Sequence, residues 1–205
     1  MTLLDQILAP RLRDYWMRLA LRRVHYTDRV GMLDLLYALE NPWRLDTAKE
    51  QARFAWTSGL IATHLSPLDT ILEIGCGEGH QSQHLARLCG RLYGIDVSAR
   101  AVRRARRRCR QASFDVGDPY TFSFADMPAP VDLVVACEVL YYVRDIPRFV
   151  ERMSQLGKAC LVTYHGGQAE TLDPQFAAVG NCQRERFRFG DTEWNALWWR
   201  NRGPA

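Results

Sequence analysis

The chain has 205 residues, of which 47% are hydrophobic and 24% charged, and its formal net charge is +4. This composition is typical of one globular domain, with or without an added cap. It contains no run of about 18 consecutive apolar residues, so we expect no membrane span. Charged residues from Asp5 onward interrupt the N-terminal stretch, which is unlike a signal peptide, and we expect a cytoplasmic protein.

The cysteines are not spaced like metal ligands or a redox pair. No two of them form a C-x-x-C pair or have zinc-ligand spacing. We therefore expect reduced, mostly buried thiols and no metal site. The six are Cys76, Cys89, Cys109, Cys137, Cys160 and Cys182.

The first third of the chain has helical patterning. Apolar residues recur at near-helical spacing over 4–19, where Pro10 breaks the pattern once. Residues 30–40 continue in the same style up to the Asn41–Pro42 turn signal, and residues 47–65 form an amphipathic pattern. These segments predict an N-terminal helical cap over residues 1–66.

After Pro67 the pattern changes to alternating strands and helices. Strands are predicted at 70–75, 91–97, 112–118 and 158–166, and residues 131–143 are predicted as a strand with its exit loop. Helices are predicted at 79–89, 98–111, 145–157 and 171–180. Residues 182–201 predict two further strands joined by a turn at Gly190–Asp191. The alternation indicates an α/β fold over residues 67–205. We expect a Rossmann-like, doubly wound, seven-stranded sheet that is mostly parallel and ends in an antiparallel hairpin.

A glycine-rich turn follows the first predicted strand. In "EIGCGEG", Gly75, Gly77 and Gly79 stand two residues apart, where a helix should begin at the carboxyl end of a strand. Ligands of such sheets bind at this end, and glycine allows them to approach the main chain. Asp96 ends the second strand 23 residues after Glu73. An acidic side chain there typically binds ribose hydroxyls, which indicates a nucleoside ligand.

The loop differs from a dinucleotide site in spacing and charge. The dinucleotide fingerprint is G-x-G-x-x-G, but here the third glycine comes one residue early. Glu73 and Glu78 would repel a pyrophosphate and would suit an ammonium or sulfonium group. A dehydrogenase is therefore disfavoured, and a non-catalytic binding module would be expected to lack the glycines or Asp96.

The segments "ILEIGCGEGHQSQHLA", "LYGIDVSARAVRRARRR" and "VDLVVACEVLYYV" resemble motifs of the class I S-adenosylmethionine-dependent methyltransferases. The resemblance covers about residues 69–159. "NPWRLDTAKEQARFAW", which precedes this core, is similar to the entry segment of the nodulation protein S branch of N-methyltransferases. The resemblance implies S-adenosyl-L-methionine as cofactor and S-adenosyl-L-homocysteine as product.

The resemblance also implies roles for individual residues. The glycine loop would surround the methionine part of the cofactor, Asp96 would bind the ribose hydroxyls, and Asp118 rather than Asp115 would accept from the adenine amino group. Val97 would pack on adenine, and the entry segment would close near the cofactor. The implied cofactor residues are Trp43, Arg44, Glu73, Gly75, Cys76, Gly77, Gly79, Asp96, Val97, Asp118, Cys137 and Glu138.

Four side chains are candidates for contact with the methyl acceptor. Glu138, Tyr141 and Tyr142 follow the fourth strand and His165 follows the fifth, all at the ligand side of the sheet. Glu138 could accept a proton from an amine or hydroxyl, or could only fix the loop. His165 could act as a base or be structural. Tyr141 and Tyr142 could line an acceptor pocket or pack in the core.

Other histidines and the C-terminal tryptophans are weaker candidates. His80 could reach the carboxylate end of the cofactor, whereas His84 is expected to face solvent. His25 and Tyr26 of the cap could also lie near the site. The tryptophans of the last strand either stack on a sugar or pack the strand; they are Trp194, Trp198 and Trp199.

The helix predicted at 98–111 carries seven arginines, which allow two interpretations. They either form a solvated face, with some stems along the core edge, or contact a polyanion such as RNA. The sequence therefore favours a methyltransferase for an N or O atom of a small polar acceptor, such as an amino sugar, oligosaccharide or other metabolite. The alternative is an RNA-modifying methyltransferase. The Glu-x-x-Glu-His metal set of RNA terminal 2′-O-methyltransferases is incomplete here, and the oligomeric state is open.

Overall fold

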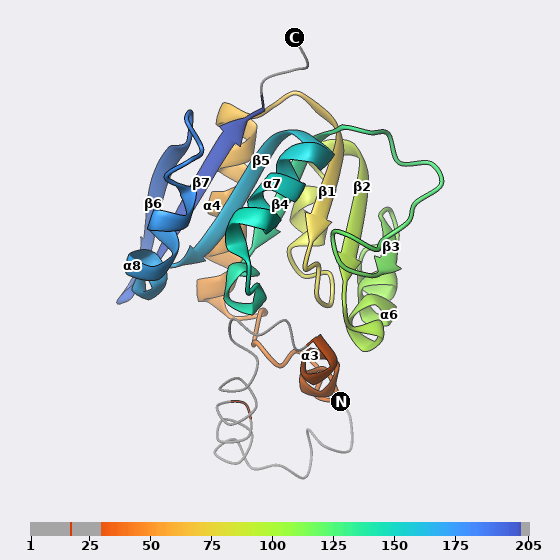
Figure 1. The fold of residues 1–205 in the computed structure, drawn as a ribbon. Helices are drawn as coiled ribbons and strands as arrows, with labels where there is room; N and C mark the ends of the chain where they lie inside the picture. Colours follow the sequence, from red (N-terminus) through yellow and green to blue (C-terminus); the bar gives the residue numbers. More distant parts are fainter. Residues whose placement is uncertain (1–16, 18–29, 202–205) are drawn as a thin grey trace.

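Seven strands form one mixed sheet in the computed structural model, which describes residue 17 and residues 30–201 (Figure 1). The helix expected at 4–19 and the candidates His25 and Tyr26 therefore lie outside the described residues, apart from Met17. The strands are β1 (Leu68–Ile74), β2 (Cys89–Asp96), β3 (Ser113–Val116), β4 (Val131–Cys137), β5 (Gly157–His165), β6 (Gln183–Phe189) and β7 (Thr192–Arg200).

The strand order confirms the predicted doubly wound topology. It runs β3-β2-β1-β4-β5-β7-β6, with the first five strands parallel. β7 lies antiparallel between β5 and β6, so the closing hairpin folds back into the sheet. The strand order reverses between β1 and β4: β2 and β3 follow on one side of β1, whereas β4 and β5 follow on the other. The carboxyl ends of β1 and β4 therefore flank the crevice where such folds bind ligands.

Six α-helices are described: α3 (Val30–Leu36), α4 (Ala48–His64), α5 (Ser82–Leu85), α6 (Ala99–Arg108), α7 (Ile146–Leu156) and α8 (Ala169–Leu172). Ser98 caps α6 by accepting from the Ala101 N–H, and Asp145 caps α7 by accepting from the Arg148 N–H. Such side-chain caps satisfy main-chain donors that have no partner within the helix. Among these described residues no helix is both long and apolar enough to cross a bilayer.

The helix predicted at 79–89 is much shorter than expected. α5 spans four residues, because β2 begins at Cys89, where the main chain pairs with Leu68 of β1. The segment predicted as one helix at 171–180 is likewise divided, into the end of α8 and the 3₁₀ turn η3 (Asp173–Phe176), which has Pro174 in its first turn. Tertiary pairing and proline override the helical pattern at these two places.

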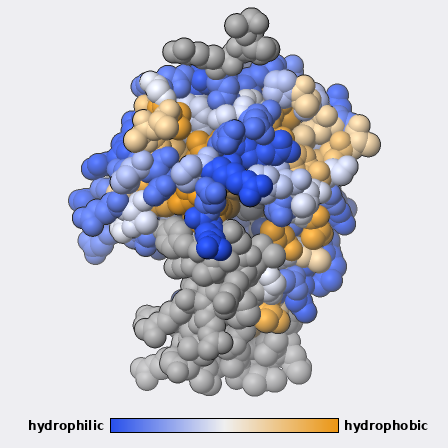
Figure 2. Space-filling view, viewed as in Figure 1, coloured by the Kyte–Doolittle hydropathy of each residue, from blue (hydrophilic) through white to orange (hydrophobic). Residues whose placement is uncertain are grey.

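The helices cover both faces of the sheet. α4 packs on one face, where Leu60 and Ile61 meet Ile71 and Leu133 of the sheet. α7 lies on the other face, on the near side in Figure 1, with Phe149 and Met153 in the larger core cluster. The outward face of the molecule over α7 is mainly hydrophilic (Figure 2). Two apolar layers therefore enclose the sheet, as expected for buried parallel strands.

The connection from β3 to β4 differs from the other crossovers because residues 117–130 contain no helix. Phe122, Phe124 and Met127 of this connection pack against the core on the α7 side. The ring centroids of Phe124 and Tyr93 are 5.1 Å apart. Three loop side chains thus cover a part of the sheet that a helix would otherwise cover.

Residues 30–47, here called the cap segment, lie beyond the edge of the sheet where the parallel strands end (Figure 1). Leu33, Leu36 and Leu39 form a small apolar cluster there, against which Trp43 and Tyr142 pack. The cap segment therefore faces the position at which the topology predicts a ligand.

Candidate active site

The glycine loop between β1 and α5 has a main-chain conformation that requires glycine. Gly75, Gly77 and Gly79 have φ values of +75°, +52° and +80°, a region that other residues rarely adopt. A Cβ on Gly77 would stand 2.9 Å from the Tyr37 hydroxyl oxygen, so a side chain does not fit beneath the cap segment. The loop can therefore present its main chain closely to a ligand.

Gly79 and the Glu78 side chain face α6 and not the ligand site to which the sequence assigned them. A Cβ on Gly79 would stand 3.0 Å from the Ala105 Cα, so this glycine allows α6 to pack closely. The Glu78 carboxylate is 1% exposed and bonds to Arg104 of α6. Neither residue lines the cavity described below. The expectation that Glu78 suits a cationic ligand is therefore corrected, because its charge is neutralised inside the protein.

Asp96 is a buried acceptor at the end of β2. Its Oδ2 accepts from the Gly77 N–H and its Oδ1 from the Ser98 N–H, both at 2.9 Å. Burial raises the pKa of this carboxyl to about 6, although both hydrogen bonds oppose the shift. A carboxylate has about four acceptor positions, so two remain for a ligand that donates a pair of hydroxyl hydrogens.

Glu73 is a buried carboxyl beneath the same loop. It is 3% exposed, and its Oε2 accepts from the Ser82 hydroxyl. Burial raises its pKa to about 8, with Asp96 adding to the shift and Ser82 opposing it. The group therefore holds its proton near neutral pH in the ligand-free protein, and a cation bound beside it would favour the charged form.

The exit of β4 carries a further, partly buried carboxyl. Glu138 adopts a φ of +60°, which is strained for a residue with a side chain. Its Oε2 accepts from the Tyr141 hydroxyl at 2.8 Å, and its Oε1 accepts from the Thr163 hydroxyl at 3.1 Å. Burial raises its pKa, while Arg53, Tyr141 and Thr163 oppose the rise. The protein thus holds this carboxyl in one orientation.

Arg53 of α4 is a site residue that the sequence analysis missed. It is 2% exposed, and its guanidinium donates to Glu50 at 2.9 Å and to the Gln81 amide oxygen at 3.1 Å. Gln81 in turn donates to the Cys137 sulfur at 3.2 Å. The signal was present: an arginine falls on the buried face of an amphipathic helix, together with Thr57 and Leu60.

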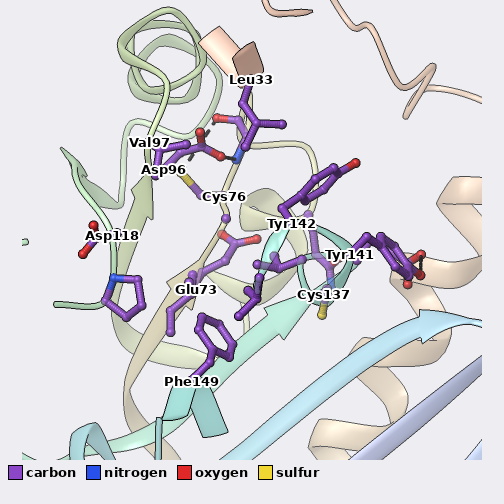
Figure 3. A pocket seen from close by; sticks show the side chains of 18 of the residues that line it. Leu33, Glu73, Cys76, Asp96, Val97, Asp118, Cys137, Tyr141, Tyr142 and Phe149 are labelled. Carbon is purple, nitrogen blue, oxygen red and sulfur yellow. Dashed lines mark hydrogen bonds between the residues drawn. The ribbon is translucent and has the colours of Figure 1, made fainter. Parts of the chain in front are cut away.

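One cavity of about 740 Å³ connects these groups. Such a volume lies within the range of small-molecule sites. Figure 3 shows Asp96, Val97 and Cys76 on one side, Cys137 and Tyr142 on the other, and Leu33 of α3 between the two sides.

Most side chains that the sequence assigned to the site line this cavity. They are Trp43, Glu73, Gly75, Cys76, Gly77, Asp96, Val97, Asp118, Cys137, Glu138, Tyr142 and His165. Arg44 is exposed and does not line it. His80 is buried beside Glu78 instead, and His84 is half-buried against the Phe54 ring rather than facing solvent.

His165 lies at the exit of β5 with one ring nitrogen engaged. Its Nδ1 accepts from the Gly167 N–H at 3.1 Å. The Tyr141 hydroxyl, which donates to Glu138, also accepts from the His165 main-chain N–H. The exits of β4 and β5 are therefore joined through Tyr141, and in a neutral His165 ring the Nε2 carries the proton.

The tryptophans of β7 belong to the packing of the sheet. Trp194 and Trp199 are each 2% exposed and Trp198 is 9% exposed, so none offers an open ring face. Among the described residues no three His, Cys, Asp or Glu side chains gather as metal ligands would.

The arginine-rich helix is also largely engaged within the protein. Arg104 is buried, Arg106 donates to the Phe114 carbonyl, and Arg108 donates to the Glu78 carbonyl. Arg100 pairs with Asp34 of α3. No residue of α6 lines the cavity. These four side chains therefore fit the expectation that some arginines of this helix lie along the edge of the core.

The two ends of the cavity can hold different chemical groups. Asp96 can accept from two hydroxyls, Glu73 can balance an ammonium, and Arg53 can bind a carboxylate, which together fit a nucleoside that carries an amino-acid group. At the other end, Glu138 and two tyrosines surround space for a polar partner.

Comparison with known proteins gives consistent results. Residues 72–159 match the methyltransferase domain family. The chain is 41% identical over 115 residues to nodulation protein S of Sinorhizobium fredii, covering 53% of this chain and 50% of that protein. It is 33% identical over 160 residues to nodulation protein S of Rhizobium tropici, covering 77% and 63% respectively. The chain thus spans about half to five-eighths of the length of these relatives.

A solved structure extends the likeness over most of the chain. The N-methyltransferase NodS from Bradyrhizobium japonicum WM9, crystallised with S-adenosyl-L-homocysteine, superposes with a TM-score of 0.68 at 26% identity. The match covers 84% of this chain and 97% of that one.

Proposed function

The chain carries a class I S-adenosylmethionine-dependent methyltransferase domain of the NodS-like branch, and we propose that it methylates a nitrogen of a small polar acceptor. Amino sugars and their oligosaccharides are the acceptor class that the likeness to the nodulation proteins favours. The observation that carries the proposal is Glu138, a partly buried carboxyl held on a strained main chain at the cavity wall.

The residues at the cofactor end fit S-adenosylmethionine. Asp96 would accept from the ribose hydroxyls, Glu73 would face the ammonium group and Arg53 would bind the carboxylate. Asp118, which also lines the cavity, would accept from the adenine amino group. When bound, the cofactor supplies a methyl group on a sulfonium, which is already a good leaving group.

The residues at the acceptor end fit an amine. An ammonium has no lone pair, so it must lose a proton before its nitrogen can attack a methyl group. Glu138 would accept that proton on a carboxylate oxygen, and its raised pKa makes it a stronger base than an ordinary glutamate. His165 is a poorer base because its Nδ1 already accepts from Gly167. Its Nε2 can instead donate to an acceptor hydroxyl, and Tyr142 provides an apolar wall.

The RNA alternative has no such support. Four arginines of α6 bond within the protein, and none of that helix lines the cavity. We therefore retain the small-molecule acceptor.

The test uses S-adenosylmethionine labelled on the methyl group. The protein would be incubated with amino-sugar oligosaccharides that have a free amine, with the same oligosaccharides N-acetylated, with total RNA and with a metabolite extract. Label in the free-amine pool and not in its N-acetylated counterpart supports the proposal. Label in metabolites through a C–O–CH₃ linkage, or in RNA, contradicts it.

A variant pair tests the base directly. Glu138→Gln should lower the rate of the labelled transfer by about a hundredfold or more, because the amide cannot accept the proton. S-adenosyl-L-homocysteine binding should be nearly unchanged. The exposed Glu170→Gln is the matched control. Equal rates for the two variants would exclude Glu138 as the base.

A further inference from the structure

Arg104 is a buried cation that the proposed chemistry does not use. It lies on α6 with 9% of its surface exposed, among arginines that are mostly half-buried or exposed. One guanidinium nitrogen donates to the Leu39 carbonyl at 2.9 Å and to the Glu78 carboxylate, and the other donates to the Tyr37 carbonyl. Tyr37 and Leu39 directly follow α3, so Arg104 holds the main chain of the turn where that helix ends.

Glu78 completes the arrangement from the side of the glycine loop. Its two carboxylate oxygens each accept from the Asn41 N–H at 3.0 Å. Arg108 donates to the Glu78 carbonyl at 2.9 Å, which fixes the main chain at the same point. One buried ion pair therefore joins three segments that are distant in sequence: the cap segment, the glycine loop and α6.

The side chains held by this ion pair form part of the cavity wall. Tyr37 places its hydroxyl over Gly77 and accepts from the Trp43 indole N–H at 3.2 Å. Leu33, Tyr37 and Trp43 all line the cavity. The cap segment has no strand pairing to fix it, so its position depends on the Leu33–Leu36–Leu39 cluster, on these polar contacts and on Asp34, which accepts from Ser98 and pairs with Arg100.

We infer that Arg104 and Glu78 form a latch that holds the cap segment on the glycine loop, and that they are positioning residues for cofactor retention. The inference rests on the proposed function for the identity of the cofactor only. Because both charges are buried, the attraction between them is little screened by salt. The expected consequence is a slow release of cofactor, since the latch must open before the cap segment can move away.

The test compares a variant without the latch with a matched control. Arg104→Met combined with Glu78→Leu removes both charges, so neither is left buried without a partner. Arg107→Met, on the exposed side of the same helix, is the control. The readouts are the S-adenosyl-L-homocysteine dissociation rate by stopped-flow, and amide hydrogen exchange of residues 30–47 compared with β1 and β4.

The double variant should release S-adenosyl-L-homocysteine about tenfold faster or more, which corresponds to about 1.4 kcal/mol. Amides of residues 30–47 should lose protection while those of β1 and β4 keep theirs. An unchanged dissociation rate, or an equal loss of protection throughout the sheet, overturns the inference. If the double variant does not fold, Arg104→Lys takes its place, because one ammonium cannot span the three acceptors; wild-type release rates would then overturn the inference.

The outcomes also separate this inference from the proposed function. If the wild-type protein does not bind S-adenosyl-L-homocysteine, the proposed function fails. Hydrogen exchange of the ligand-free protein still tests whether Arg104 and Glu78 hold the cap segment, since the protection of residues 30–47 should depend on these two side chains with no ligand present.

Discussion

The two ends of the cavity are built by different means. At the cofactor end the main chain supplies the framework: the N–H groups of Gly77 and Ser98 hold the Asp96 carboxylate. At the acceptor end a side chain supplies the framework: the Tyr141 hydroxyl donates to Glu138 and accepts from the main-chain N–H of His165, where β5 ends. A framework made of main chain depends on few residue types, whereas one made of side chains can change with single substitutions. The first end suits a constant cofactor, and the second suits an acceptor that differs between relatives.

The largest expected effect is at the cofactor end. Asp96→Ala removes a charged acceptor to which two ribose hydroxyls would donate, and each such hydrogen bond is worth about 1.5–3 kcal/mol. The affinity for S-adenosyl-L-homocysteine should fall by about a hundredfold or more, measured by calorimetry. Asp115→Ala, on β3 and outside the cavity, should have little effect. An affinity equal to wild type would remove Asp96 from the ribose site.

Glu73→Gln tests the buried proton at the same end. The pKa of Glu73 is about 8 in the native state and 4.5 for an ordinary glutamate in water, so the native state binds more protons than the unfolded state between these values. The contribution of Glu73 to the free energy of unfolding is therefore complete below pH 4.5 and is lost as the pH rises through 8.

The variant should abolish this loss, so its free energy of unfolding relative to wild type should rise by about 3 kcal/mol between pH 5 and pH 9. Urea unfolding at the two pH values measures the difference. Parallel behaviour of both proteins would mean that Glu73 is already ionised in the native state.

Arg53→Met separates two parts of the cofactor. S-adenosyl-L-homocysteine should bind about thirtyfold more weakly, because a charge-assisted hydrogen bond to its carboxylate is lost. Methylthioadenosine, which has no carboxylate, should bind both proteins equally. Lys49→Met, an exposed change on α4, is the control. Equal weakening of both ligands would assign Arg53 a general structural role.

Tyr141→Phe has the smallest expected effect and concerns the acceptor end. The Tyr141 hydroxyl lowers the pKa of Glu138, so its removal should raise that pKa. A base works when deprotonated, so the acid limb of the kcat/KM profile should move to higher pH, with cofactor affinity unchanged. Tyr142→Phe should leave the limb in place. A fall in rate at every pH without a shift would show that Tyr141 does not act through Glu138.

The sequence predicted the parts of the fold and site that depend on local pattern. The parallel strands, the closing hairpin, the glycine loop and Asp96 all follow from spacing within a few residues. The short α5 did not, because the pairing of Cys89 with Leu68 ends it. Glu78 was misassigned because its partner Arg104 lies 26 residues away, beyond any local periodicity. Arg53 was missed although the helical pattern places it on the buried face of α4, because its partner Gln81 lies 28 residues away.

β7 joins β5 to β6 although it is the last of the seven strands in the chain. During synthesis on the ribosome, β5 therefore emerges with an open side that stays unpaired until residues 192–200 appear. Its residues are almost all buried in the finished protein, so this open edge is both apolar and ready to pair with another chain. The hairpin that closes the sheet consequently protects the nascent protein from aggregation, and a chain that stops short of Thr192 would lack that protection.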